Sequence, residues 1–188
     1  MLPALTLILP ANNEAEHIGP CLSAVLASNS LTDNAPVQII VAANGCSDDT
    51  AQLARGFAAQ TESRGWQLDV IELAQGNKIG ALNAAETQAK ANALVYLDAD
   101  VHISPTLLAQ TASALQTQAP IYASGTVKLS PSKSWATRAY GTFYLQTPFM
   151  KQPAPGCGYF GMNAAGRARW AEWPAVISDD KGVVGTAR

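Results

Sequence analysis

The sequence predicts an α/β fold with a mostly parallel central sheet flanked by helices. Two observations lead to this prediction. Short apolar or alternating segments, typical of strands, recur along the first two-thirds of the chain, and segments with helical spacing of apolar residues separate them. Strands and helices that alternate in this way form parallel sheets with right-handed crossovers. No internal repeat or linker interrupts the pattern, so we expect one domain over residues 1–188.

Five strands are predicted from their apolar or alternating residues. Residues 93–97 are apolar throughout, which is typical of a strand buried on both faces. Residues 66–73 alternate between apolar and polar side chains, which favours a half-buried strand. In chain order, the predicted strands cover residues 4–10, 37–43, 66–73, 93–97 and 121–129.

Four helices are predicted between these strands, at residues 12–28, 47–65, 77–91 and 104–118. In the first helix, Asn13 and Glu16 resemble a capping box. Pro20 lies inside the same pattern, and it indicates that the helix starts late or kinks there.

The other helices carry their own start and stop signals. Ser47 or Asp48 is the expected N-cap of the second helix, and Gly65 its expected end. Ser104 is the expected N-cap of the last helix, with Pro105 at its first position. The third helix is rich in small residues, so we expect it to lie close to the sheet.

The composition excludes several classes of protein. Of the 188 residues, 48% are hydrophobic and 14% charged, which indicates a globular rather than a disordered chain. A net charge of -2 gives no bulk attraction for nucleic acid. Three cysteines without a CxxC pair argue against a zinc site or a disulfide framework. The sequence lacks a signal-peptide pattern and a long apolar run, so we expect a cytoplasmic protein.

Polar residues collect directly after the predicted strands. Because the carboxyl ends of parallel strands meet at one edge of a sheet, and ligands bind at that edge, these segments should be neighbours. They are Pro10–Glu14, Asn44–Asp48, Gly76–Lys78 and Asp98–Asp100.

Asp98 and Asp100 follow a buried strand directly and lie one residue apart. Carboxylates in this arrangement suit Mg²⁺ or Mn²⁺, which prefer oxygen ligands and often share their shell with phosphates. The alternative is a plain turn, in which Asp98 caps the backbone and Asp100 is solvated. These two residues alone leave both interpretations open.

Six motifs in order resemble those of family 2 glycosyltransferases. "LPANNEAEHI", "VAANGCSDDT", "GNKIGALNAA" and "LDAD" follow the first four strands, and "GCGYFGMNAAGRARW" and "ISDD" come later. The resemblance covers residues 5–180 and implies a single GT-A-like domain. It implies that residues from 1 to about 125 bind a nucleotide-sugar and that residues from about 126 to 188 shape the acceptor side.

The resemblance also assigns residues to roles. The residues it places at the nucleotide-sugar are Pro10, Ala11, Asn12, Glu14, Asn44, Lys78 and Asp98. It makes Asp100 the metal ligand and Asp180 the catalytic base. On the side of the acceptor or the donor sugar it places Gly156, Cys157, Gly158 and Asp179.

The implied reaction is transfer of a sugar, with inversion, from a nucleotide-sugar to an acceptor hydroxyl, with Mg²⁺ or Mn²⁺ as cofactor. UDP is the default nucleotide of the family, and the acceptor is a saccharide, a lipid-linked molecule or another hydroxyl compound. Asp180 needs only to be ionised and within hydrogen-bond reach of that hydroxyl. The inner face of the membrane is an alternative location, with peripheral contact through the aromatic segment 135–149.

The sequence departs from the family pattern in two places. Ala43 stands where an aspartate usually precedes Asn44, and the chain ends at Arg188, soon after Asp180, so we expect a compact member or a truncated acceptor side. These departures keep open a non-catalytic module that binds a nucleotide-sugar or a partner. A sugar-nucleotide pyrophosphorylase is disfavoured, because its Gly-rich, basic first loop is replaced here by "PANNEAE".

Overall fold

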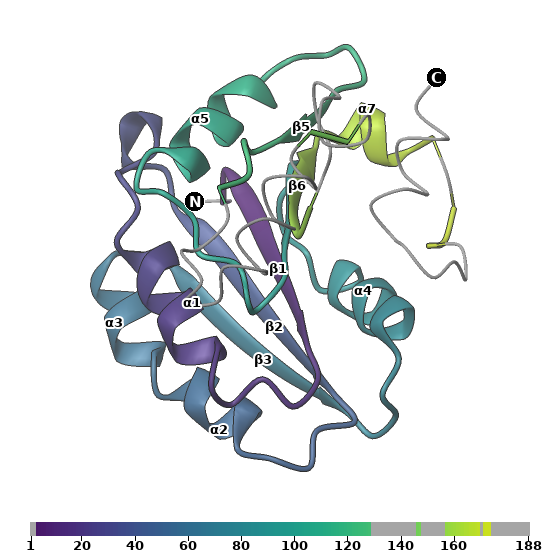
Figure 1. The fold of residues 1–188 in the computed structure, drawn as a ribbon. Helices are drawn as coiled ribbons and strands as arrows, with labels where there is room; N and C mark the ends of the chain where they lie inside the picture. The colour runs from purple at the N-terminus through teal and green to yellow at the C-terminus, as the bar shows by residue number, and fades with distance from the viewer. Residues whose placement is uncertain (1–2, 129–145, 148–156, 170, 174–188) are drawn as a thin grey trace.

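A six-stranded sheet lies at the centre of the computed structural model, which describes residues 3–128, 146–147, 157–169 and 171–173 (Figure 1). Its strand order is β3-β2-β1-β4-β6-β5. The first four strands along the chain pair in parallel, and β6 pairs antiparallel with both β4 and β5. The predicted α/β fold with a mostly parallel sheet is therefore confirmed.

The first four strands agree with the prediction to within one residue at each end. They are β1 Leu5–Ala11, β2 Val37–Asn44, β3 Gln67–Leu73 and β4 Leu94–Leu97. The fifth is much shorter than predicted, because β5 covers only Tyr122–Ser124. The sequence analysis missed β6, Tyr159–Met162, which lies between β4 and β5 in the sheet.

The helices cover both faces of the sheet. They are α1 Ile18–Leu26, α2 Thr50–Arg55, α3 Ala58–Ser63, α4 Lys78–Glu86, α5 Leu107–Ala114 and α7 Ala164–Arg167, with a 3-10 turn at Thr32–Asn34. α1 and α5 pack on one face, and α4 packs on the other. Figure 1 shows α4 apart from the layer formed by α1, α2 and α3.

The expected capping box of the first helix was wrong. Asn13 has a left-handed backbone conformation, with φ of 54°, and its side-chain oxygen accepts a hydrogen bond from the Ser47 N–H at 2.8 Å. The helix begins only at Ile18, after His17. Pro20 therefore lies in the first turn, where its missing N–H costs no intrahelical hydrogen bond. The late start inferred from Pro20 is confirmed.

The second predicted helix is two short helices, separated at Gly56 and Phe57. Its N-cap is Asp49, whose side chain makes no capping bond. The predicted Asp48 precedes the N-cap, and its Oδ1 accepts from the N–H of Thr50, the first helical residue, at 3.1 Å. The predicted stop at Gly65 is confirmed. Gly65 has φ of 70°, and the Trp66 N–H donates to the Thr61 carbonyl at 3.1 Å, which is the closing bond of a Schellman motif.

The last predicted helix also starts later than expected. α5 begins at Leu107 with Thr106 as N-cap, so Ser104 and Pro105 precede the helix. The Leu107 N–H donates to the Ser104 carbonyl at 3.1 Å, which makes this stretch a turn leading into the helix. The start of α4 differs, since the Asn77 side chain caps it by accepting from the Gly80 N–H.

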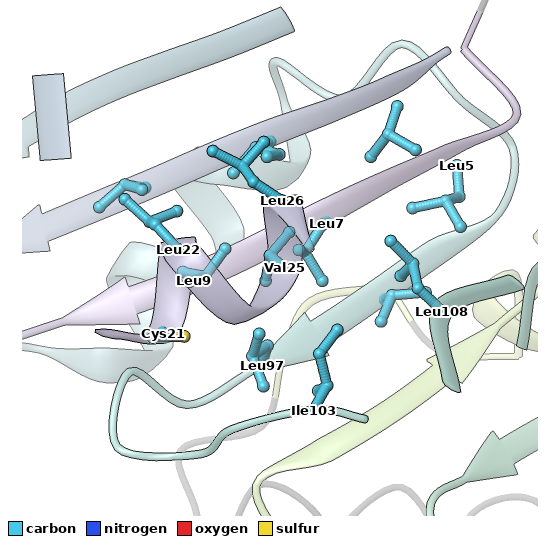
Figure 2. Close-up of a cluster of buried hydrophobic side chains, with 14 of the residues drawn as sticks. Leu5, Leu7, Leu9, Cys21, Leu22, Val25, Leu26, Leu97, Ile103 and Leu108 are labelled. Atoms are coloured by element: carbon cyan, nitrogen blue, oxygen red, sulfur yellow. The ribbon is translucent and has the colours of Figure 1, made fainter. Parts of the chain in front are cut away.

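Alternating residues of β1 supply the core on both faces of the sheet. Leu5, Leu7 and Leu9 face α1 and contribute to the larger cluster, as Figure 2 shows. Ile8 points to the other face, where the small side chains of α4 pack against it together with Tyr96. The expectation that small residues bring this helix close to the sheet is consistent with the full burial of Ala81 and Ala85.

β6 extends the sheet beside the end of β4. The Asp98 N–H donates to the Gly158 carbonyl at 2.8 Å, just beyond the paired residues of the two strands. Gly158 has φ of 76°, and a Cβ there would lie 2.7 Å from Val101 Cγ2 and 3.3 Å from Asp98 Oδ2. Glycine is therefore required by both the backbone conformation and the close approach.

Leu7 tests the core. Its side chain is fully buried, so Leu7→Ala should lower the free energy of unfolding by about 3 kcal/mol, through lost transfer energy and the cavity left behind. Urea denaturation measures this change. Leu53→Ala is the control, because Leu53 is 43% exposed and should change stability by less than about 0.5 kcal/mol. Equal effects in the two variants would contradict the assigned core.

Gly158 tests the approach of β6 to Asp98. Gly158→Ala should destabilise the protein by about 1–3 kcal/mol, because alanine must adopt positive φ and displace Val101 or Asp98. Gly19→Ala is the matched control, since Gly19 lies in α1 with no atom within 4 Å of the added Cβ. The control should be neutral or stabilising by up to about 1 kcal/mol. A neutral Gly158→Ala variant would refute the close approach.

Candidate active site

The four polar segments predicted to be neighbours meet in one pocket of about 350 Å³. The pocket lies at the carboxyl ends of β1, β2 and β4 and at the start of α4. Its lining consists of Pro10, Asn12, Glu14, Asn44, Gly76, Asn77, Lys78, Asp98, Ala99 and Asp100. Among the residues assigned to the nucleotide-sugar, Ala11 alone does not line it. Ala11 is buried, and its carbonyl accepts a hydrogen bond from Asn44.

Lys78 and Asp98 form an ion pair inside this pocket. The Lys78 Nζ lies 2.8 Å from Asp98 Oδ1, and the two side chains are 41% and 36% exposed. An ion pair with this exposure contributes little to folding stability. The ion pair matters for the pocket instead, because it places the positive charge of Lys78 beside the carboxylates that follow β4.

Asp98 and Asp100 lie on a tight turn, and both line the pocket. The Val101 N–H donates to the Asp98 carbonyl at 3.0 Å, so the turn interpretation of this segment is correct for the backbone. The carboxylate of Asp100 is exposed and has no hydrogen bond or ion pair within the described part of the chain. The turn thus presents a carboxylate to the pocket, as the metal interpretation requires.

The donor set at this turn fits a hard divalent cation. In the described ranges, no group of three His, Cys, Asp or Glu side chains converges on a common point. Among the described residues, the oxygen ligands at this turn would come from Asp98 and Asp100. Mg²⁺ is commonly held by one or two carboxylates together with substrate phosphates and water, and this pair suits that arrangement.

Asn44 joins three elements beneath the pocket. Its side-chain N–H groups donate to the carbonyls of Ala11 at 2.9 Å and Ala42 at 3.2 Å, and its side-chain oxygen accepts from the Asn77 N–H at 3.0 Å. Both amide hydrogens are thus used within the protein. Asn44 therefore supports the loops around it, and it also lines the pocket in which the family resemblance places the nucleotide-sugar.

Glycines let the ends of β2 and β3 approach each other beside Asn44. Gly45 has φ of 58°, and a Cβ there would lie 2.3 Å from the Gly76 nitrogen. The Gly45 N–H donates to the Leu73 carbonyl at 2.7 Å. Asn12 crosses over this junction and donates to the Asn44 carbonyl at 2.5 Å. The four loops of the site are therefore connected by hydrogen bonds.

The first loop is also fastened to the start of α2, by Asp48 and by Thr50, which the sequence analysis did not single out. The Glu14 N–H donates to Thr50 Oγ1 at 2.8 Å, and the Ala15 N–H donates to Asp48 Oδ2 at 3.0 Å. The hydrogen bond from the Thr50 hydroxyl is the main reason why the pKa of Asp48 lies below its usual value. The Asp-x-Thr spacing, typical of a local side-chain turn, was the available signal.

Two of the three cysteines, Cys21 and Cys46, lie near the site. Burial raises the pKa of Cys21 to about 12, with further contributions from the charges of Asp100, Asp98 and Glu14. Its thiol therefore stays protonated at neutral pH. Cys46 lies in the second loop, where its thiol donates to the Ala11 carbonyl at 3.5 Å.

The residues assigned to the acceptor side are only partly described. Cys157 and Gly158 lie at the turn into β6, and Gly158 packs against Asp98. Within the described chain, the need for glycine at 158 comes from its positive φ and from the closeness of Asp98 and Val101. Gly156, Asp179, Asp180 and the aromatic segment 135–149, apart from 146–147, lie outside the described residues. The described helices include none long and apolar enough to span a bilayer.

Known proteins resemble this chain in sequence. The model of a family described as "Glycosyl transferase family 2" matches residues 6–172. The 4,4'-diaponeurosporenoate glycosyltransferase of Staphylococcus aureus (strain USA300) is 34% identical over 101 residues, which cover 52% of this chain and 24% of the relative. The chain therefore matches about a quarter of the length of this curated relative.

Solved structures resemble this chain in fold. The mannosyltransferase PcManGT from Pyrobaculum calidifontis, in complex with GDP-Man and Mn²⁺, aligns with a TM-score of 0.76 at 22% identity, over 100% of this chain and 52% of that one. TarS 1-349 from S. aureus aligns with a TM-score of 0.69 at 15% identity, over 97% of this chain and 54% of that one.

The similarities agree with the motifs and with the sheet. The GT-A-like fold expected from the sequence is confirmed by the structural neighbours. The family match extends over most of the chain and includes the four loops that form the pocket. The chain therefore belongs to glycosyl transferase family 2.

Proposed function

We propose that the chain transfers a sugar from a nucleotide-sugar to an acceptor hydroxyl, with a divalent metal ion and with inversion at the anomeric carbon. The observation that carries this proposal is the meeting of Lys78, Asp98 and Asp100 in one pocket at the carboxyl edge of the sheet. Family membership supports the same reaction class. Related folds have been solved with GDP-Man and Mn²⁺, and with UDP-GlcNAc, which supports a nucleotide-sugar donor here.

Charge explains why a cation belongs in this pocket. A diphosphate brings about two negative charges toward two carboxylates, and each pair of like charges about 4 Å apart costs about 4 kcal/mol at an effective dielectric of about 20. Lys78 offsets only one of these charges. Mg²⁺ or Mn²⁺ bound at Asp100 would remove the repulsion and stabilise the negative charge of the departing diphosphate.

Lys78 and Asp98 have separate roles in binding the donor. The ammonium group of lysine has three donors, so Lys78 can keep its bond to Asp98 and donate another to a phosphate oxygen. Asp98 holds Lys78 in place and serves the ribose or the outer shell of the metal. UDP remains the proposed nucleotide because it is the default of the family.

We assign the catalytic base to Asp180, with Asp179 beside it on the acceptor side. The acceptor hydroxyl forms a bond to the anomeric carbon while the bond to the diphosphate oxygen breaks and its electron pair leaves with the nucleotide. Asp180 takes the proton of the hydroxyl, and an ordinary carboxyl pKa of about 4 is sufficient for this. A single displacement inverts the anomeric configuration. The acceptor is a saccharide, a lipid-linked molecule or another hydroxyl compound.

Metal-dependent donor binding tests the first half of the proposal. Titration with UDP-, GDP- and dTDP-sugars should detect binding with Mn²⁺ and weak or no binding with EDTA. Loss of even an outer-shell partner of a metal costs about 10- to 100-fold in affinity, so Asp100→Asn should weaken binding at least about tenfold. Asp33→Asn is the control, since Asp33 is exposed and does not line the pocket. Binding that ignores both Mn²⁺ and Asp100→Asn would refute the metal assignment.

Asp180→Asn tests the base. Loss of a general base should lower kcat by about 100- to 10,000-fold, while the dissociation constant of the donor with Mn²⁺ stays unchanged. Turnover assays with the donor identified by titration measure kcat, and calorimetry measures the dissociation constant of the same donor. Full turnover by Asp180→Asn would assign the base elsewhere. Binding without transfer by the wild-type protein would favour the non-catalytic module.

A further inference from the structure

A second cluster of polar groups lies at the far end of α4, outside the active-site pocket. Its centre is Glu86, the last residue of α4, whose side chain is 12% exposed. Glu86 Oε1 accepts from the Tyr96 hydroxyl at 2.7 Å and from the Trp173 indole N–H. Glu86 Oε2 lies 2.7 Å from Arg167 Nε, whose side chain is 17% exposed. One carboxylate thus collects three partners.

These partners come from two separate parts of the sequence. Tyr96 lies on β4, close to the loops that line the pocket. Arg167 lies on α7, and Trp173 follows α7 in the sequence. Trp173 is also held through its backbone, since its N–H donates to the Asn83 side-chain oxygen on α4 at 3.2 Å. Glu86 therefore joins the part of the chain that forms the pocket to the part expected to shape the acceptor side.

Stability alone does not account for a charge at this position. Aromatic rings surround the cluster: Tyr96 stacks on Phe160 with centroids 4.8 Å apart, and Trp173 meets the edge of Tyr96 at 5.1 Å. Burial here raises the pKa of Tyr96 well above its usual value. Replacing a buried ion pair by apolar side chains is often neutral or stabilising. Apolar side chains in place of this cluster would pack without a fixed orientation. The hydrogen bonds to Glu86, in contrast, require one orientation of Trp173 and Arg167.

The same helix reaches the active site at its other end. α4 begins at Lys78, and its nine residues span about 13 Å at 1.5 Å per residue. The Asn77 N–H is bound by Asn44 at this first turn, and Glu86 is bound at the last. α4 is thus fastened at both ends, with the pocket at one end and Trp173 at the other.

We propose that Glu86 is a positioning residue for glycosyl transfer. By holding Trp173 and Arg167 against α4, it sets the orientation of the acceptor-side part of the chain relative to Lys78 and Asp98. Along the sequence, Asp179 and Asp180 follow Trp173 within seven residues, so the chain continues toward them from this fixed point. The inference rests on the proposed function and adds to it a residue that touches neither donor nor acceptor.

Kinetics of Glu86→Ala and Glu86→Gln test the inference. Because small misplacement of reacting groups costs up to about 100-fold, Glu86→Ala should lower kcat by about 10- to 100-fold, with the donor dissociation constant in Mn²⁺ unchanged. Glu86→Gln should fall between Glu86→Ala and wild type, because its carbonyl can still accept from Tyr96 and Trp173 but no longer pairs with the charge of Arg167. Glu72→Gln is the matched control: Glu72 also pairs with an arginine, Arg55, but on the surface, and both parameters should stay at wild-type values.

Hydrogen exchange gives a readout that does not depend on activity. In Glu86→Ala, the Trp173 amide should lose protection while the amides of β1 and β2 keep theirs. Donor affinity that falls together with kcat, or a kcat that falls only in proportion to the folded fraction, would reduce Glu86 to a stabilising residue and overturn the inference. Absence of transfer by the wild-type protein would refute the proposed function instead. Unchanged exchange at Trp173 would then still overturn the role of Glu86.

Discussion

The hydrogen bonds of the buried Asn44 side chain are the interaction on which the site depends. They hold the ends of β1 and β2 and the first turn of α4 at fixed distances, so the loops that follow these elements converge. A buried amide left without partners would cost about 1–3 kcal/mol, so the three elements must stay in register for Asn44 to be satisfied. The pocket therefore follows from the way Asn44 joins these elements at the sheet edge.

The acidic turn after β4 is held from two sides. The Gly158 carbonyl accepts from the Asp98 N–H on one side, and the Lys78 ammonium meets the Asp98 carboxylate on the other. The repulsion between neighbouring carboxylates is thereby reduced at Asp98, while Asp100 stays available to the pocket. This asymmetry gives the two acids different environments, as the different roles implied by the family resemblance require. It supports the assignment of the metal to Asp100 and of an auxiliary role to Asp98.

The pattern of apolar residues was sufficient to predict the strands β1 to β4, because that pattern lies within each segment and does not depend on distant residues. The convergence of the polar loops then followed from parallel topology. Predictions failed where a distant partner decides the local structure: Asn13 binds Ser47 instead of capping a helix, and β6 exists because β4 pairs with it. The role of Glu86 could not be predicted either, since its partners lie up to 87 residues away along the chain. The base assigned to Asp180 rests on the family pattern.

The two ion pairs on α4 differ in what they allow. Lys78 and Asp98 are more than one-third exposed, so water screens their attraction and a phosphate oxygen can share or replace a partner at little cost. Glu86 and Arg167 are largely buried, and breaking such a pair leaves an uncompensated charge that costs about 3–5 kcal/mol. The Lys78–Asp98 pair at the start of α4 can therefore exchange partners at the pocket. The Glu86–Arg167 pair at the end of α4 holds two parts of the chain in one geometry. The proposed transfer would require both, because a donor that binds reversibly would still need an acceptor held in a constant position.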